Sequence, residues 1–327
     1  MEDRSRTKRR SHKRKKKSVG RIVFFIFSII FMFLTTIGSY FVWQAYRDVR
    51  TTTDEMYEEV EAQEQHSSRQ DRPVVVDDGE DPFSVLIMGV DTGEYGRIET
   101  GRTDTMMVLT VNPNTNQTSI VSIPRDTYTE IIGRGEKDKI NHAYAFGGTA
   151  MAVNTVQNLF DIPIDYYVSV NMESMQQIVD AVGGITVVPP ITFSQAGYQF
   201  NEGQPVSMGG AQALEYSRMR YNDPDGDYGR QHRQRQVIEG TMSSIASFDS
   251  LRNYRSILES LSTNMKTNMS FDDMFDMFNN YRGSVSNVEQ LQLSGHGQMQ
   301  NGVYYEMIPD EELTRVREHL NGELELN

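Results

Sequence analysis

Five arginines lie within the stretch EYSRMRYNDPDGDYGRQHRQRQV, although the chain as a whole has a formal net charge of -13. Arg218 and Arg220 are two residues apart, a spacing that directs both side chains to one side of an extended backbone. In a helix, Arg230 shares a face with Arg233 and Gln234, which follow three and four residues later. Guanidinium groups stay charged and bind phosphate oxygens in pairs, so this cluster predicts a site for a phosphorylated ligand.

The same arginines could instead be surface residues that form ion pairs with nearby acids. The acids considered as their partners are Asp223, Asp225, Asp227 and Glu239. The stretch alone does not decide between a phosphate site and a set of surface ion pairs.

Acidic and basic residues also stand at the ends of three strand-like stretches upstream. Asp91 follows the stretch FSVLIMGV, Asp104 lies at the start of TDTMMVLTV with Arg102 just before it, and Arg125 follows TSIVSIP. If the second and third stretches form a hairpin beside the first, all four side chains lie at one edge of a sheet. Carboxylate oxygens hold Mg²⁺, usually with substrate phosphates completing the coordination shell. The pattern therefore predicts magnesium between Asp91 and Asp104.

Strand-like and helix-like segments alternate from residue 83 onward. We expect strands at 83–90, 103–111, 118–124, 165–171, 185–190 and 302–308. We expect helices at 149–160, 172–184, 209–218, 230–248 and 310–320, with two more between 249 and 292. Because a hairpin is mixed with crossover connections, the fold class expected is α/β, as a single domain with a central mixed β-sheet flanked by helices on both faces.

An uncharged stretch of 22 residues, Ile22–Trp43, separates a basic N-terminus from an acidic body. Residues 1–21 carry 11 Lys and Arg against 2 Asp and Glu, whereas residues 44–327 carry 21 against 43. As a helix the stretch would rise about 33 Å, enough to cross a hydrocarbon core of about 30 Å. The positive-inside rule then places the N-terminus in the cytoplasm and the body outside the cell. A cleaved signal peptide would have a shorter apolar stretch ending in small residues.

These features divide the chain into four expected parts. They are a basic cytoplasmic tail at 1–21, a single transmembrane helix at 22–43, a solvated extracellular stalk at 44–80 and an extracellular catalytic domain at 81–327. The chain has no cysteine, which excludes disulfides and thiolate metal sites and suits an exported protein of a Gram-positive bacterium.

Seven short motifs follow one another between residues 83 and 250: GVD, GRTDT, SIPRDT, KINHAY, VGGITV, ALEYSRMRY and DYGRQHRQRQV. In this order and spacing they resemble the LytR-CpsA-Psr family. Its members attach anionic glycans, such as wall teichoic acid or capsular polysaccharide, to peptidoglycan. They take the glycan phosphate from an undecaprenyl-pyrophosphate carrier and pass it to a hydroxyl of muramic acid. The resemblance implies a magnesium-dependent phosphotransferase anchored in the cell membrane.

The resemblance also implies roles for individual residues. Asp91 and Asp104 match the acids that hold magnesium. The other matched residues surround the pyrophosphate headgroup: the arginines Arg102, Arg125, Arg218, Arg220 and Arg230, with Lys139, Gln234 and Arg233 as further contacts.

Three other functions remain open. A membrane-anchored polyprenyl-pyrophosphate hydrolase would use the same magnesium and arginines with water as the acceptor, and a glycan-binding module would bind the ligand without catalysis. The basic N-terminus suggests a transcriptional regulator, but a body with 43 acidic and 21 basic residues would repel DNA. The partners expected are therefore a lipid-linked glycan, peptidoglycan and the cell membrane, and no nucleic acid.

Overall fold

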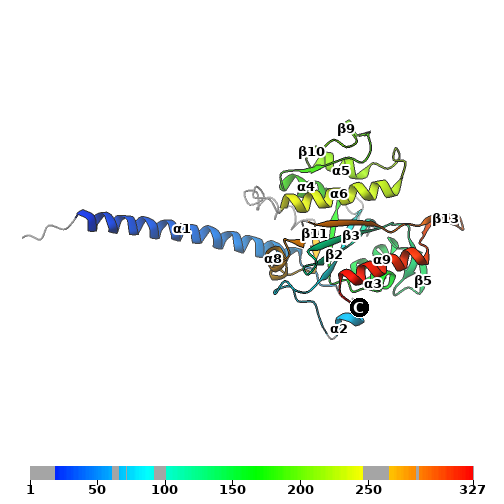
Figure 1. Ribbon diagram of the computed structural model, residues 1–327, viewed down its shortest axis with the longest axis horizontal. Helices are drawn as coiled ribbons and strands as arrows, with labels where there is room; N and C mark the ends of the chain where they lie inside the picture. The colour runs from blue at the N-terminus through cyan, green and yellow to red at the C-terminus, as the bar shows by residue number, and fades with distance from the viewer. Residues whose placement is uncertain are drawn as a thin grey trace, which may run out of the picture. The chain divides into compact units, whose positions relative to one another are not determined.

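The computed structural model describes residues 19–60, 66–70, 72–91, 101–245, 265–284 and 287–326. The chain forms two compact units, Met1–Asp48 and Val49–Asn327. Figure 1 shows the second unit as a layered body in which helices lie on both sides of a sheet.

Helix α1, Val19–Met56, contains the predicted membrane segment 22–43. Within the described residues, no helix combines the length and the apolar character that crossing a membrane requires. Most of residues 1–21 and many side chains of the predicted membrane segment lie outside the described set. The anchor and the cytoplasmic tail therefore stay predictions.

The body is built on a six-stranded mixed sheet with the order β11-β6-β1-β2-β3-β12. The pairs β1/β2, β2/β3 and β6/β11 are antiparallel, and β1/β6 and β3/β12 are parallel. The bounds are β11 Met265–Thr267, β6 Tyr166–Asn171, β1 Phe83–Val90, β2 Thr103–Asn112, β3 Gln117–Ile123 and β12 Val288–Gln292. The predicted hairpin beside the first strand is therefore confirmed as β2/β3.

Helices cover both faces of this sheet, as the sequence predicted (Figure 1). On β1, Leu86 and Met88 belong to a core shared with α3 and α9, whereas Val85 belongs to a core on the other face with α6 and α8. Burial on both faces explains why the strands read as nearly continuous apolar runs. The bounds are α3 His142–Phe160, α9 Asp310–Glu323, α6 Asp227–Ile245 and α8 Phe271–Asn280.

A smaller layer packs on the outer side of α6 around its own apolar core. Phe193, Phe200 and Tyr216 stack in this core, with ring centroids 4.6–5.7 Å apart. The layer fixes the end of α5 against α6. It consists of α4 Met172–Ala181, β7 Ile185–Val187, β8 Phe193–Gln195, β9 Tyr198–Phe200, β10 Val206–Met208 and α5 Gly210–Arg218.

Several elements differ from the prediction. The two helices expected within 249–292 correspond to α8 alone among the described residues, while β11 and β12 are strands and residues 246–264 lie outside the described set. In β12, Leu291 and the following Leu293 are buried in alternation with Gln290 and Gln292, the period of a strand. Three hairpins were missed in whole or in part: β4 Tyr128–Ile131 with β5 Glu136–Lys139, β8 with β9, and β13 His296–Gln300 with β14 Val303–Met307.

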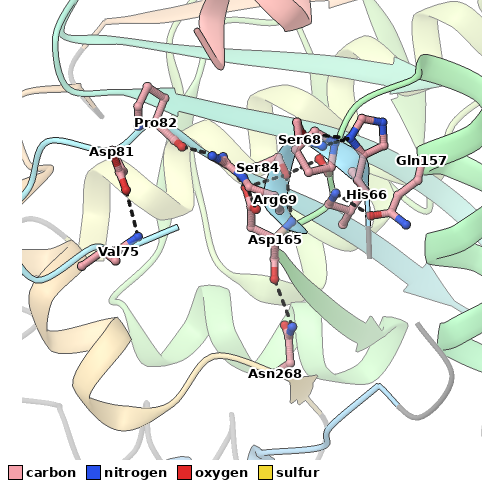
Figure 2. Close-up of polar contacts among 12 residues, drawn as sticks. His66, Ser68, Arg69, Val75, Asp81, Pro82, Ser84, Gln157, Asp165 and Asn268 are labelled. Carbon is pink, nitrogen blue, oxygen red and sulfur yellow. Dashed lines mark hydrogen bonds and ion pairs between the residues drawn. The ribbon is translucent and has the colours of Figure 1, made fainter. Parts of the chain in front are cut away.

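Parts of the segment expected to be a solvated stalk instead pack on the body, both at the buried Thr53 and Met56 and over its second half. Arg69, in the short helix α2 (Ser67–Gln70), donates from Nε and Nη2 to the two carboxylate oxygens of Asp165 at 2.9 and 3.1 Å. Asp165 also accepts from the backbone N–H of Ser84 in β1 at 3.0 Å. Figure 2 shows this carboxylate between α2, β1 and the start of β6. The ion pair is almost enclosed, with side-chain exposures of 12% and 4%.

We expect Asp165→Ala to lower the free energy of unfolding by about 3–5 kcal/mol, because it leaves the guanidinium of Arg69 buried without its counter-ion. The matched control is Arg134→Ala. Its ion pair with Glu136 is exposed on both sides, with side-chain exposures of 41% and 52%, so its loss should change stability by about 1 kcal/mol or less. Urea unfolding of the full chain followed by circular dichroism measures both. Equal effects would show that the Arg69 pair does not hold the segment.

Candidate active site

The first group of predicted site residues meets at one edge of the sheet, where β1 ends and β2 begins. Gly89 pairs with Thr105 and Val90 with Thr103, so Asp104 is the extra residue of a β-bulge. Bulges redirect side chains and are frequent beside active sites. The backbone N–H of Asp91 donates to the carbonyl of Arg102 at 2.9 Å, which brings the ends of the two strands together.

Arg125 joins this edge from the end of β3. Its Nη1 donates to Oδ1 of Asp104 at 2.5 Å, and its Nε lies 3.8 Å from Oδ2 of Asp126. Burial opposes the charge of Arg125, but the attraction and hydrogen bond of Asp104, together with the charges of Asp126 and Asp227, raise the pKa of the guanidinium. Lys139 donates from Nζ to Asp126 at 2.7 Å. Because Asp126 follows Arg125 in the chain, this bond brings Lys139 to the same edge.

The second group comes from the turn between α5 and α6. Asp227 is the first residue of α6, where the helix dipole stabilises a negative charge. Its Oδ1 lies 2.7 Å from Nη2 of Arg230 and 3.7 Å from Nε of Arg220. Arg218 is the last residue of α5 and is half-buried. The turn therefore places two of the predicted arginines, Arg220 and Arg230, around one carboxylate.

Arg230 connects the two groups electrostatically. It is 9% exposed, and burial lowers the pKa of its guanidinium. Asp227 opposes that shift, the positive charges of Arg125 and Arg220 add to it, and Asp104 also opposes it. The charges of both groups thus act on one guanidinium, and the prediction that Asp104, Arg125, Arg220 and Arg230 converge agrees with this arrangement.

Arg230 is paired in charge but not in hydrogen bonding. Although Nη2 is within ion-pair distance of Asp227, the approach is not aligned for a hydrogen bond. In the described part of the chain, buried Nε and Nη2 of Arg230 and Oε1 of Gln234 have no hydrogen-bond partner. A buried polar atom without a hydrogen bond lowers stability unless a ligand or a water molecule supplies that bond. Arg230 and Gln234 lie four residues apart on one face of α6, so the unused hydrogen-bonding atoms of both can face the same ligand.

Arg233 does not fit the predicted contact with a headgroup. It is fully buried, and its Nε donates to the carbonyl of Tyr216 at 3.1 Å. Nη1 donates to Asp223 and Nη2 to the carbonyl of Met219, and the guanidinium lies over the ring of Phe193, 5.2 Å from its centroid. Its partner Asp223 is one of the acids that the ion-pair alternative named, but Arg233 is buried rather than on the surface, and it joins α6 to α5 and the adjoining turn.

A supporting network behind Asp227 was missed by the sequence analysis. Arg235 donates from Nη1 to Gln292 at 2.9 Å, Gln292 donates to Gln231 at 2.8 Å, and Gln231 donates to Oδ2 of Asp227 at 2.9 Å. Arg235 also donates to Ser122 at 2.6 Å, and burial lowers its pKa to about 10. The four-residue spacing of Asp227, Gln231 and Arg235 was the available signal, because it places all three on one face of α6. The network holds one oxygen of Asp227 and leaves the other beside Arg230.

The remaining predicted residues lie at the edge of this site. Arg102 is exposed at the start of β2, and Asp91 is half-buried at the end of β1. No group of three or more His, Cys, Asp or Glu side chains within the described ranges could hold a metal ion. Two carboxylates at the ends of neighbouring strands fit a magnesium ion that substrate phosphates share, the usual mode for Mg²⁺, but not a site made wholly of protein ligands.

The sequence matches a family model and a named relative, and the fold matches solved structures. The model of the LytR_cpsA_psr family matches residues 43–322. The polyisoprenyl-teichoic acid–peptidoglycan teichoic acid transferase TagU of Enterococcus faecalis is 48% identical over 310 residues, which make up 95% of this chain and 98% of that protein.

Two solved structures extend the likeness to the fold. The crystal structure of B. subtilis TagU has a TM-score of 0.61 and 46% identity, covering 75% of this chain and 97% of that one. A crystal structure from Enterococcus faecalis, described as a transcriptional regulator, has a TM-score of 0.69 and 40% identity, covering 78% of this chain and 91% of that one.

Substitutions of Arg230 and of Arg233, which are only three residues apart, should have different effects on the free energy of unfolding. We expect Arg233→Ala to lower the free energy of unfolding by about 3–5 kcal/mol, because it leaves Asp223 buried and unpaired. Arg230→Ala should change it by about 1 kcal/mol or less, because the nitrogens removed have no hydrogen-bond partner to leave behind. Denaturant unfolding of the two variants measures the difference. A loss as large for Arg230→Ala as for Arg233→Ala would make Arg230 a structural residue.

Proposed function

This chain belongs to the LytR-CpsA-Psr family, and from that membership we propose that it transfers a glycopolymer phosphate from an undecaprenyl-pyrophosphate carrier to a muramic acid hydroxyl of peptidoglycan. Teichoic acid is the polymer that the name of its E. faecalis relative supports. The enzyme is then a glycopolymer–peptidoglycan phosphotransferase. A capsular or similar anionic polysaccharide would use the same chemistry.

The observation that carries the proposal is the state of Arg230. A buried guanidinium that is paired in charge but has two nitrogens without hydrogen-bond partners in the described chain suits a ligand rich in acceptor oxygens. Gln234, one helical turn on, has a buried amide oxygen in the same state. Because a carbonyl oxygen only accepts, its partner would be a hydroxyl or amide of the ligand or an ordered water. A phosphate bonded to a sugar supplies both kinds of group.

The physical task of the site is to hold charge rather than to form a covalent bond with substrate. Phosphoryl transfer needs the attacking hydroxyl, the phosphorus and the leaving oxygen in line, and it needs positive charge where the leaving oxygens develop. Arg125, Arg220 and Arg230 would neutralise the pyrophosphate, because they converge and stay protonated. Arg102, Arg218 and Lys139 would contact the headgroup from the surrounding edge.

The carboxylates Asp91 and Asp104 would hold magnesium at the edge of the sheet. When bound, the ion supplies positive charge that stabilises the oxygens of the pyrophosphate. Asp104 would have a second role, because its hydrogen bond with Arg125 fixes the direction of that guanidinium. The Asp227 carboxylate, held by Gln231, would do the same for Arg230 and Arg220.

We also propose that the body lies outside the cell and is attached to the membrane by the stretch 22–43. The substrate carrier is a membrane lipid and the acceptor belongs to the cell wall, so an anchored outer enzyme meets both. The strong charge asymmetry between residues 1–21 and 44–327 supports this orientation. A nucleic-acid-binding role, which the description of one structural relative would suggest, conflicts with the net negative charge of the body.

We expect Arg230→Ala to lower the rate of glycan transfer at least about 100-fold, since it removes a charge-stabilising donor. The assay supplies a lipid-pyrophosphate glycan and peptidoglycan and measures glycan joined to the wall material. The control is Arg282→Ala, an exposed arginine just after α8 whose guanidinium lies over the ring of Phe278; its rate should equal that of the unaltered chain. Release of free glycan phosphate with no joined product would identify a hydrolase instead.

Removal of divalent cations should abolish transfer, and Mg²⁺ or Mn²⁺ should restore it. Binding can be measured independently by electron paramagnetic resonance of Mn²⁺ in the presence of a polyprenyl pyrophosphate. Asp104→Asn should weaken that binding at least about tenfold, because it removes one anionic ligand. Full transfer in a chelator, or unchanged Mn²⁺ binding by Asp104→Asn, would contradict the assignment of a metal to these carboxylates.

A further inference from the structure

The hairpin formed by β13 and β14 is attached directly to the candidate active site. The backbone N–H of Glu306 donates to the carbonyl of Asp126 at 2.9 Å, next to Arg125. Glu306 is 6% exposed, and one of its carboxylate oxygens accepts from the hydroxyl of Tyr228 at 2.7 Å. Tyr228 follows Asp227 in the first turn of α6. The hairpin is therefore fixed to both halves of the site. Figure 1 shows β13 at one end of the body.

One face of this hairpin leads outward from the site. Directly paired residues on antiparallel strands point to the same side, so Gly297 and Glu306 share a face with Met299 and Tyr304. We call these four residues the hairpin face. At its inner end Glu306 is buried, whereas further out Tyr304 is 43% exposed and Met299 is 62% exposed. The face thus passes from a buried carboxylate to an exposed apolar surface.

The ring of Tyr304 is fixed in orientation although it is partly exposed. Its hydroxyl donates to the second carboxylate oxygen of Glu306 at 2.6 Å, and this bond raises the pKa of Tyr304 to about 12. The ring lies against Gly297, because a Cβ added there would be 2.5 Å from a ring carbon. A glycine at this position lets the ring lie across the hairpin, and the anchored hydroxyl prevents it from rotating away. The result is an immobilised aromatic surface that solvent reaches.

We propose that the hairpin face binds a sugar ring of the acceptor glycan, so that the attacking hydroxyl is held at the arginine site. A fixed aromatic ring suits the apolar face of a pyranose, and its rigidity reduces the entropy lost on binding. This inference rests on the proposed function, because it assigns a place to the acceptor of that same reaction. It gives Tyr304 a role in positioning and binding, with no part in bond formation.

Charge favours the acceptor over the donor glycan as the occupant. The carboxylates of Glu306, Asp126 and Asp227 all act on Tyr304. Residues 44–327 carry 43 acidic against 21 basic side chains. A donor polymer with phosphate in its repeats would be repelled along this face, whereas the sugar backbone of peptidoglycan carries no phosphate.

The test compares Michaelis constants for the two substrates in the full chain. The acceptor is a tetrasaccharide of alternating N-acetylglucosamine and N-acetylmuramic acid whose lactyl carboxyl groups are capped as amides, so that it carries no charge. We expect Tyr304→Ala to raise the KM for this acceptor about tenfold and to leave the KM for the lipid-linked donor unchanged. Gly297→Ala should also raise the acceptor KM, because the added methyl group displaces the ring. Tyr304→Phe, which keeps the ring, should have the smaller effect. The control Phe275→Ala removes an aromatic ring that is 54% exposed on α8 and should change neither constant.

A binding measurement separates this inference from the proposed function. Trp43 is the single tryptophan, so Trp43→Phe combined with Tyr304→Trp places one fluorophore on the hairpin face. Its emission should respond to the tetrasaccharide even if no transfer product forms. A rise in the donor KM instead of the acceptor KM would overturn the inference, and so would an unchanged acceptor KM together with silent fluorescence. If the fluorescence responds but the unaltered chain never joins glycan to peptidoglycan, the proposed function fails and the sugar site stands.

Discussion

A buried guanidinium needs hydrogen-bond acceptors for its N–H groups, and this requirement distinguishes the two buried arginines of α6. Arg230 and Arg233 are both buried on this helix. Arg233 is surrounded by two backbone carbonyls and Asp223, so its desolvation is compensated inside the protein. Arg230 has the charge of Asp227 nearby but retains unbonded nitrogens within the described chain. Since a buried donor without a partner is costly, the fold tolerates Arg230 at an energetic disadvantage that a phosphate would remove.

The residues behind the site explain how that arrangement is kept in place. Asp227 is held by Gln231, which is held by Gln292 of β12, which in turn accepts from Arg235. The network ties the first two turns of α6 to the edge strand of the sheet. A binding site works only if its own side chains are held by a second layer, and here that layer is polar and buried. The position of β12 in the sheet therefore supports the candidate site as well as the fold.

Distant parts of the chain are brought to the same edge by the mixed sheet. Strands β1, β2 and β3 supply Asp91, Asp104 and Arg125, and the α5–α6 turn approaches from the layer above. The β13–β14 hairpin adds a surface directly beside them. At another part of the body, Asp165 fixes the segment before β1. This segment is consequently a packed part of the body.

The sequence by itself determined the fold class and most of the candidate site, because both depend on local patterns. Strand ends carrying Asp104 and Arg125, and a helix carrying Arg230 and Gln234, are visible as spacing and periodicity. Only the tertiary structure decided which arginine is structural, since Arg233 and Arg230 have the same charge and differ only in what surrounds them. The strand β12 pairs with the distant β3, and the hairpin face is held at the site by contacts of Glu306 with the distant Asp126 and Tyr228, so these contacts leave only a weak trace in the order of residues. Local chemistry is encoded along the chain, whereas burial and partnership exist only after the chain has folded.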